Sequence, residues 1–214
     1  MVHIKEIERE IAHYFKGSSH NMDHTLRVYK LAEYIAKQEK ANLNVVRYAA
    51  LLHDIGRSVE DATQGRICHA KHSAKLAIGI LYKKDISNDM IKRITHCIET
   101  HRFRNNKQPE TLEAKVLFDA DKLDSIGLVG VARAYMFGGE KGLRMYSPLN
   151  ETQDINKNIY DSKEHTPVTE FVMKLSKVKD CLFTETGRRL AIKKHKVMVD
   201  FFNELEEEIK SINL

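Results

Sequence analysis

Four side chains of the kinds that bind divalent cations are spread along the chain. They are His24, the adjacent pair His53 and Asp54, and Asp121. Two imidazoles and two carboxylates can hold one divalent metal ion, and such an ion can turn water into a nucleophile at neutral pH. The residue types therefore indicate metal-assisted hydrolysis, provided that the fold brings the four side chains together.

Each of the two histidines continues a helical stripe of apolar residues. His53 follows Val46, Ala49 and Ala50, and His24 precedes Val28, Leu31 and Ile35 at helical spacing. Burying an imidazole without a partner costs roughly 1–3 kcal/mol, so both rings need a ligand or a hydrogen bond. Metal coordination would satisfy both, and ordinary core histidines bonded to backbone or hydroxyl groups are the alternative.

The composition predicts an all-α protein. Its 214 residues include only three prolines and ten glycines, and most apolar residues recur at helical spacing. The length suits one sizeable core, and no Gly/Ser-rich or Pro-rich linker divides the chain. We therefore expect a single domain over residues 1–214, with an appended helical part.

Charge and cysteine content narrow the class of protein further. The net charge of +5 is modest, and the basic residues are spread along the chain among 30 acidic ones. Their one local concentration, between Arg188 and Lys196, has no interleaved aromatic residues, so nucleic-acid binding is not indicated. Three cysteines form no C-x-x-C pair, and no apolar run is long enough for export or membrane spanning. We expect a cytoplasmic protein with no membrane partner.

The periodicity predicts a series of helices that carry the candidate residues. Their expected ranges are 3–16, 24–40, 44–55, 69–82, 87–101, 111–126, 168–180 and 186–211. Asn44, Ser87 and Thr111 are the expected N-caps, and His53 and Asp54 fall on the last turn of their helix. A polar loop is expected between residues 56 and 68.

Three acidic residues share the expected helix 111–126. Residues two apart point to opposite sides of a helix, so Asp119 and Asp121 cannot serve the same site, whereas Asp121 and Asp124 share a face. Spacing alone leaves open which carboxylate is the ligand.

Residues 138–167 form an expected polar loop before the C-terminal helices at 168–211. The stretch begins with Gly138, Gly139 and Gly142 and shows no periodicity further on. Loops of this length are uncommon unless they are functional, so it could cover a pocket or bind a partner. A plain surface insertion is the alternative.

The candidate residues stand in three segments that resemble known motifs. His20, Asn21, His24, Arg27 and Val28 resemble H-D-x-x-H-x-x-R-V; residues 49–56 read AALLHDIG; and residues 119–124 read DADKLD, similar to D-A-D-R-L-D. On these motifs the chain is identified as a member of the HD-domain metal-dependent phosphohydrolase superfamily. The likeness covers roughly residues 18–202 and extends to small bacterial and archaeal members that hydrolyse nucleoside triphosphates to monophosphate and pyrophosphate.

The resemblance implies a fold and roles for individual residues. The fold would be an HD-domain helical bundle, with a metal-binding core at about 18–135. The metal ligands would be His24, His53, Asp54 and Asp121. The side chains that orient these ligands would be His20, Asp119 and Asp124. His69 and His101 occupy places where two-metal members have extra histidines, and they would bind a second metal or contact phosphate.

The implied activity is hydrolysis of a phosphoester or phosphoanhydride bond, with a phosphorylated small molecule, a nucleotide, as substrate. Basic residues near the ligand helices would offset the substrate's charge, and the candidates are Arg27, Arg57, Arg102, Lys122 and Arg133. Nitrogen and oxygen ligands favour Mn²⁺, Mg²⁺, Fe²⁺ or Ni²⁺, with one ion expected and two allowed. A nucleotide-sensing module without turnover is the alternative, and the oligomeric state is not indicated.

The sequence departs from neighbouring patterns in two places. Asn21 stands where this branch usually has Asp, which weakens any role for a charge at that position. Arg57 and Ser58 stand where alarmone hydrolases carry an acidic pair. Alarmone hydrolysis by their mechanism is therefore not expected, and Glu60 and Asp61 are at best shifted substitutes.

Overall fold

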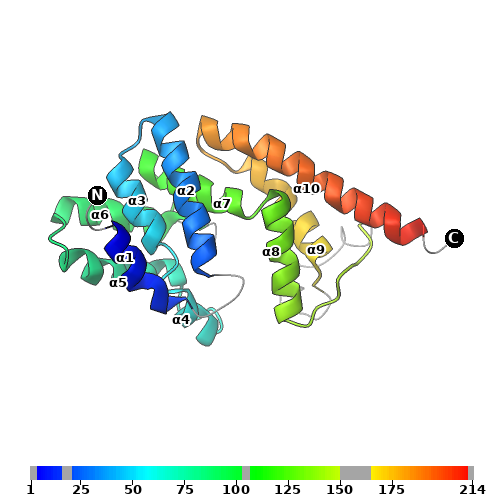
Figure 1. Cartoon of the computed structure of the whole chain (residues 1–214), viewed down its shortest axis with the longest axis horizontal. Coiled ribbons are helices and arrows are strands. Elements are labelled where there is room, and N and C mark those ends of the chain that lie inside the picture. Colours follow the sequence, from blue (N-terminus) through cyan, green and yellow to red (C-terminus); the bar gives the residue numbers. More distant parts are fainter. Residues whose placement is uncertain (1–3, 16–20, 103–106, 150–164, 212–214) are drawn as a thin grey trace. The chain divides into compact units, whose positions relative to one another are not determined.

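A computed structural model describes residues 4–15, 21–102, 107–149 and 165–211 (Figure 1). Every regular element in these ranges is helical, which confirms the all-α class. Within the same ranges, no helix combines the length and apolar character that crossing a membrane requires. His20 lies outside the described residues, and so do residues 150–164 of the polar loop expected at 138–167.

The chain divides into two compact units that are described separately. Residues 1–121 and 183–187 form the first unit, and residues 122–182 and 188–214 form the second. The single-domain organisation expected from the sequence stays a prediction. All the candidate metal ligands belong to the first unit.

The first unit is built from seven α-helices and a short 3₁₀ turn among its described residues. They are α1 (Ile4–Ile11), η1 (Ala12–Tyr14), α2 (Met22–Glu39), α3 (Leu43–Leu52), α4 (Arg57–Ala62), α5 (His69–Tyr82), α6 (Asn88–Thr100) and α7 (Leu112–Asp124), of which α7 ends in the second unit. α3 is central, because it packs against α1, α2, α5 and α6. Its residues Val45 to Leu52 are almost all buried, which accounts for its nearly continuous apolar sequence.

The second unit contains α8 (Gly127–Glu140), α9 (Pro167–Met173), η3 (Leu175–Asp180) and most of α10 (Glu185–Ser211). α8 contacts α9, and the rings of Phe171 and Phe202 stack with centroids 4.2 Å apart. Met198 and Val168 add to this core. It is a separate apolar cluster that does not include the candidate ligands.

Several helices begin or end differently from the prediction. The cap of α3 is Asn42, whose side chain accepts from the backbone N–H groups of Asn44 and Val45, so the expected cap at Asn44 was wrong. The helix ends at Leu52, and His53 and Asp54 lie in the turn that follows. The helices α5 and α6, with Ser87 as N-cap of α6, agree with the prediction, and Thr111 accepts from the N–H of Ala114 as expected.

Two helices formed where none was expected. Residues 57–62, assigned to a loop, form α4, a helix with no buried residue and therefore no apolar stripe that periodicity could detect. α8 lies at residues 127–140, for which no helix was expected, and its end at 138–140 had been assigned to a loop because of Gly138 and Gly139. Gly130 in that helix is needed, since a Cβ there would lie 2.2 Å from the carbonyl oxygen of Ser125.

Candidate metal centre

The candidate ligands lie at helix ends, where the backbone fixes their positions. His24 is in the first turn of α2, and its backbone N–H donates to the side-chain oxygen of Asn21, the N-cap, at 3.1 Å. An asparagine oxygen caps a helix as well as a carboxylate does. The Asn at this position therefore still anchors the turn that carries His24, although it brings no charge.

The turn after α3 carries His53 and Asp54 and is held against α5. Gly56, at the end of this turn, donates its N–H to Ser73 Oγ at 2.9 Å. A Cβ on Gly56 would lie 2.7 Å from the backbone nitrogen of Ser73 and 2.9 Å from the carbonyl oxygen of His69. The glycine thus permits the close approach that places Asp54 beside His69.

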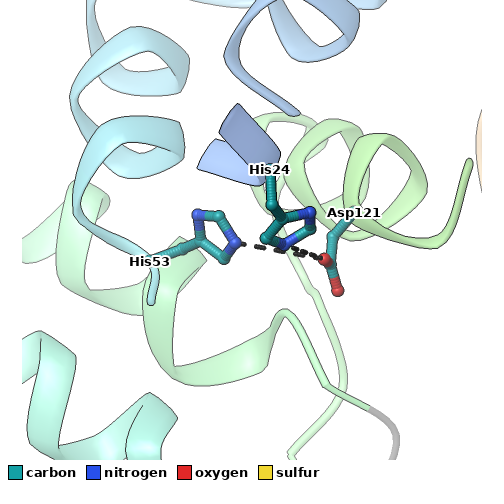
Figure 2. A group of neighbouring side chains, drawn as sticks. All are labelled: His24, His53 and Asp121. Carbon is teal, nitrogen blue, oxygen red and sulfur yellow. Dashed lines mark ion pairs between the residues drawn. The ribbon is translucent and has the colours of Figure 1, made fainter. Parts of the chain in front are cut away.

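His24, His53 and Asp121 form the first of two groups of candidate ligands (Figure 2). They come from α2, from the turn after α3 and from α7. The Asp121 Oδ1 atom lies 3.4 Å from His24 Nε2 and 3.9 Å from His53 Nε2. Asp54 Oδ2 lies 3.7 Å from His24 Nε2 and 3.8 Å from His53 Nε2, which brings the four predicted ligands together.

Asp54, His69 and His101 form the second group, and all three are buried. The other oxygen of Asp54, Oδ1, lies 3.2 Å from His69 Nε2 and 3.6 Å from His101 Nε2. The two imidazole Nε2 atoms are 3.1 Å apart. Asp54 thus directs one oxygen toward each group.

The donor atoms of the first group fit a divalent cation. His53 is fully buried, its Nδ1 lies 2.7 Å from the carbonyl oxygen of Ala50, and its Nε2 has no hydrogen-bond partner. His24 Nε2 and His53 Nε2 lie 3.7 and 3.8 Å from Asp54 Oδ2, and His53 Nε2 lies 3.9 Å from Asp121 Oδ1. These distances are too long for hydrogen bonds. Atoms that each lie about 2.1 Å from one ion are roughly 3–4 Å from one another, so a cation would satisfy them all.

Electrostatics keep the ligands in their metal-binding forms. Burial lowers the pKa of His53 to about 4, so its ring is neutral at physiological pH. Burial by itself raises the pKa of Asp54, but the nearby His53 and His101 outweigh it and hold this pKa well below its usual range. A neutral imidazole and an ionised carboxylate are the forms that bind metal.

The other acids of α7 have different partners. Asp119 is fully buried and accepts from the backbone N–H groups of Phe183 and Thr184, at 2.9 and 2.7 Å, and from the Thr184 hydroxyl. It therefore anchors the segment that leads into α10. Asp124 pairs with Arg133 at 3.0 Å inside the second unit.

The predicted substrate-binding cations have different surroundings. Arg57 and Arg102 both reach His69, with Nη1 atoms 2.9 and 3.2 Å from its Nδ1. Arg27 lies on α2 one turn after His24, and Lys122 directly follows Asp121 on α7. Arg133 is the partner of Asp124 described above.

Glu60 lies at the second group, although the sequence suggested it only as a shifted substitute for the acidic pair of alarmone hydrolases. Its Oε2 contacts His69 Nδ1, and its Oε1 accepts from Arg102 Nη1 at 2.7 Å. Although burial raises the pKa of Glu60, the hydrogen bonds from His69 and Arg102 lower it to about 2. Its position six residues after Asp54 was the only sequence signal, because α4 has no recognisable pattern.

The chain is similar to known proteins over the range that carries both groups. The family model of the HD domain matches residues 21–126, a range that contains all the members of both groups. The uncharacterized protein YpgQ of Bacillus subtilis is 33% identical over 207 residues, which are 92% of this chain and 88% of YpgQ. The chain belongs to the HD-domain phosphohydrolase superfamily.

Solved structures are similar to this chain over nearly its whole length. Bacillus subtilis YpgQ in complex with ADP has a TM-score of 0.75 and 31% identity, covering 96% of this chain and 97% of that one. An HD-superfamily hydrolase from Bacillus thuringiensis has a TM-score of 0.72 and 27% identity, covering 97% and 96%. HD domains bind divalent metals, and the two groups supply the residues that could do so here.

Proposed function

We propose that this HD-domain protein hydrolyses a phosphoester or phosphoanhydride bond of a nucleotide with the help of a divalent cation. His24, His53, Asp54 and Asp121 would hold the ion. The observation that carries the proposal is the buried Nε2 of His53, which has no hydrogen-bond partner and faces two carboxylates. A divalent ion bound there would lower the pKa of water and neutralise charge on a phosphoryl group.

The chain's own residues would prepare this site for a phosphorylated substrate. The hydrogen bond that His53 Nδ1–H donates to Ala50 O keeps the proton on Nδ1 and leaves Nε2 available for the cation. Arg57 and Arg102 bring two guanidinium groups to the edge of the second group, and guanidinium pairs with phosphate oxygens in forked geometry. Both arginines are half-buried, so their charges are less screened than on an open surface.

We propose that the two groups bind cations with different strength. The first group offers two histidines with the carboxylates of Asp121 and Asp54 within 4 Å. The second offers two histidines and only the remaining oxygen of the same Asp54. One ion should therefore bind tightly at the first group, and the second group should take a weaker cation or contact phosphate directly.

The nucleotide part of the proposal is supported by the relative that was solved with ADP. That structure aligns with nearly all of this chain, so a similar ligand is a reasonable expectation here. A triphosphate cleaved to monophosphate and pyrophosphate is the specific reaction that we propose.

A panel of nucleoside mono-, di- and triphosphates with Mn²⁺ tests the function. Phosphate and pyrophosphate should be measured separately, since only their ratio identifies the bond that is cleaved. We expect triphosphates to release pyrophosphate and the His53→Ala variant to be inactive. Tight nucleotide binding without product would instead support the sensing role.

A further inference from the structure

His53, His69 and His101 are buried with Nε2 within 4 Å of Asp54, and each can bind a cation through Nε2 only when its proton is on Nδ1. For two of them the helix itself supplies the acceptor. His53 Nδ1 lies 2.7 Å from Ala50 O, and His101 Nδ1 lies 2.6 Å from Ile98 O. Both rings directly follow the last residue of a helix, where backbone carbonyls remain available. A carbonyl only accepts, so the proton must be on Nδ1.

His69 cannot use this arrangement, because it is the first residue of α5 and no helical turn precedes it. A residue from another helix contacts its Nδ1 instead. That residue is Glu60 of α4, whose carboxylate oxygen Oε2 is in hydrogen-bond contact with the ring. The side chain of Glu60 is 13% exposed and that of His69 4%, so water has little access to this contact.

Two other groups near the same ring nitrogen favour the opposite tautomer, and so does the Asp54 carboxylate, which can accept a proton from Nε2. The Nη1 atoms of Arg57 and Arg102 lie 2.9 and 3.2 Å from His69 Nδ1. A guanidinium only donates hydrogen bonds, so both would stabilise a lone pair on Nδ1 and a proton on Nε2. A proton on Nε2 would point into the second group, where Asp54 Oδ1 and His101 Nε2 lie 3.2 and 3.1 Å away, and would block a cation there.

We propose that Glu60 is a positioning residue that selects the Nδ1-protonated tautomer of His69 against the influence of the two arginines and of Asp54. Its Oε2 accepts the His69 proton, while Oε1 accepts from Arg102 at 2.7 Å and holds that guanidinium in place. This leaves the Nε2 lone pair of His69 available to the second group. Binding of a cation by this Nε2 rests on the proposed function, whereas the choice of tautomer does not.

The tautomer of His69 can be measured in metal-free protein. Two-bond ¹H–¹⁵N correlation spectra distinguish Nδ1–H from Nε2–H, and a His69→Gln variant assigns the signal. We expect Nδ1–H in the wild type and Nε2–H in Glu60→Ala. Glu60→Gln should keep Nδ1–H because an amide oxygen can accept the proton, which separates the acceptor role from the charge.

One further variant is a control for this test, and another replaces Glu60→Ala if that variant folds poorly. Asp61→Ala removes the neighbouring carboxylate of α4, which is exposed, and should leave the His69 tautomer unchanged. If Glu60→Ala folds poorly, Glu60→Met keeps the length of the side chain without an acceptor and should show the same switch to Nε2–H. An Nδ1–H signal that persists in a folded Glu60→Ala or Glu60→Met variant overturns the proposal.

Mn²⁺ titration supplies a second measurement. Loss of a residue that orients a ligand typically weakens metal binding 10–100-fold, so we expect roughly that effect on the weaker Mn²⁺ site of Glu60→Ala and little change at the stronger site. If the wild type binds one Mn²⁺ but Glu60→Ala still switches the tautomer, the second-cation assignment fails and the role of Glu60 stands. Equal weakening at both sites would contradict a role confined to His69.

Discussion

At the scale of single residues, the polar atoms of His53 and Asp54 lie in surroundings that suit metal binding. The His53 ring is fully buried with one nitrogen bonded to a carbonyl and the other unpaired, and Asp54 extends one oxygen toward each group. Neither arrangement adds to the apolar core. We therefore expect both residues to matter for metal binding more than for folding.

Replacing either ligand should remove the metal and leave the helices in place. For His53→Ala and Asp54→Ala we expect metal affinity to fall by more than about 100-fold, beyond the effect of losing an orienting partner, with loss of activity. Metal analysis and circular dichroism measure the two effects. His13→Ala, a change at an exposed histidine, is the control. Wild-type metal content in either variant would remove that residue from the site.

Asp119 and Asp121 should respond differently to the same substitution. Asp121→Asn should abolish turnover with little change in stability, because this carboxylate faces His24 and His53. Asp119→Asn should reduce turnover less but lower the free energy of unfolding by about 1–3 kcal/mol, since Asp119 holds the backbone at Phe183 and Thr184. Initial rates and urea unfolding of both variants test this. The reverse order would mean that the wrong face of α7 was assigned to the site.

At the scale of elements, the position of the second group depends on how closely the turn after α3 approaches α5. Gly56 allows that approach because a side chain there would collide with backbone atoms of His69 and Ser73. The ligands Asp54 and His69 flank this contact on two different elements. A change in the spacing of the elements should therefore affect the ligands directly.

Gly56→Ala should both destabilise the first unit and weaken metal binding. The added methyl would lie 2.7 Å from the Ser73 nitrogen, so α5 must move, at a cost of about 1–3 kcal/mol. Thermal unfolding and Mn²⁺ titration measure the two effects.

Gly79→Ala is the matched control for this change. It lies in the interior of the same helix α5 with no atom within 4 Å of the added methyl, and should stabilise by up to about 1 kcal/mol. Normal metal binding by Gly56→Ala would show that the close approach is not required for the site.

At the scale of the whole molecule, the candidate ligands join segments of the first unit that are far apart in sequence. They span residues 24 to 121 and come from α2, α5, α7 and the ends of α3 and α6. None belongs to the second unit. An ion bound there would crosslink most of the first unit.

Metal should therefore stabilise the first unit selectively. At a free Mn²⁺ concentration 100 times its dissociation constant, the free energy of unfolding should rise by about 2.7 kcal/mol. Hydrogen exchange should slow in α2, α5 and α6, whereas α9 and the end of α10 should be unaffected. Equal slowing in α9 and α5 would show that the effect of the metal is not confined to the ligand-bearing unit.

The sequence by itself determined the fold class, most helices and the identity of the candidate ligands. Helical periodicity is a local property, so it identified α5 and α6 and placed His24 and His53 on buried faces. The family motifs are also local, since each lies within a short segment. The preference for Asp121 over Asp119 came from the motif, because the spacing of the acids left it open.

Only the tertiary structure decided which residues surround the ligands. The helix α4 gave no sequence signal, because a short polar helix has no apolar stripe. The sequence suggested Glu60 only as a shifted substitute, since its role depends on His69, Arg57 and Arg102 being brought together. The same holds for Asp119, whose partners at Phe183 and Thr184 are more than 60 residues away. Contacts between distant segments depend on how whole helices pack, and the periodicity of a single segment carries no information about its partner.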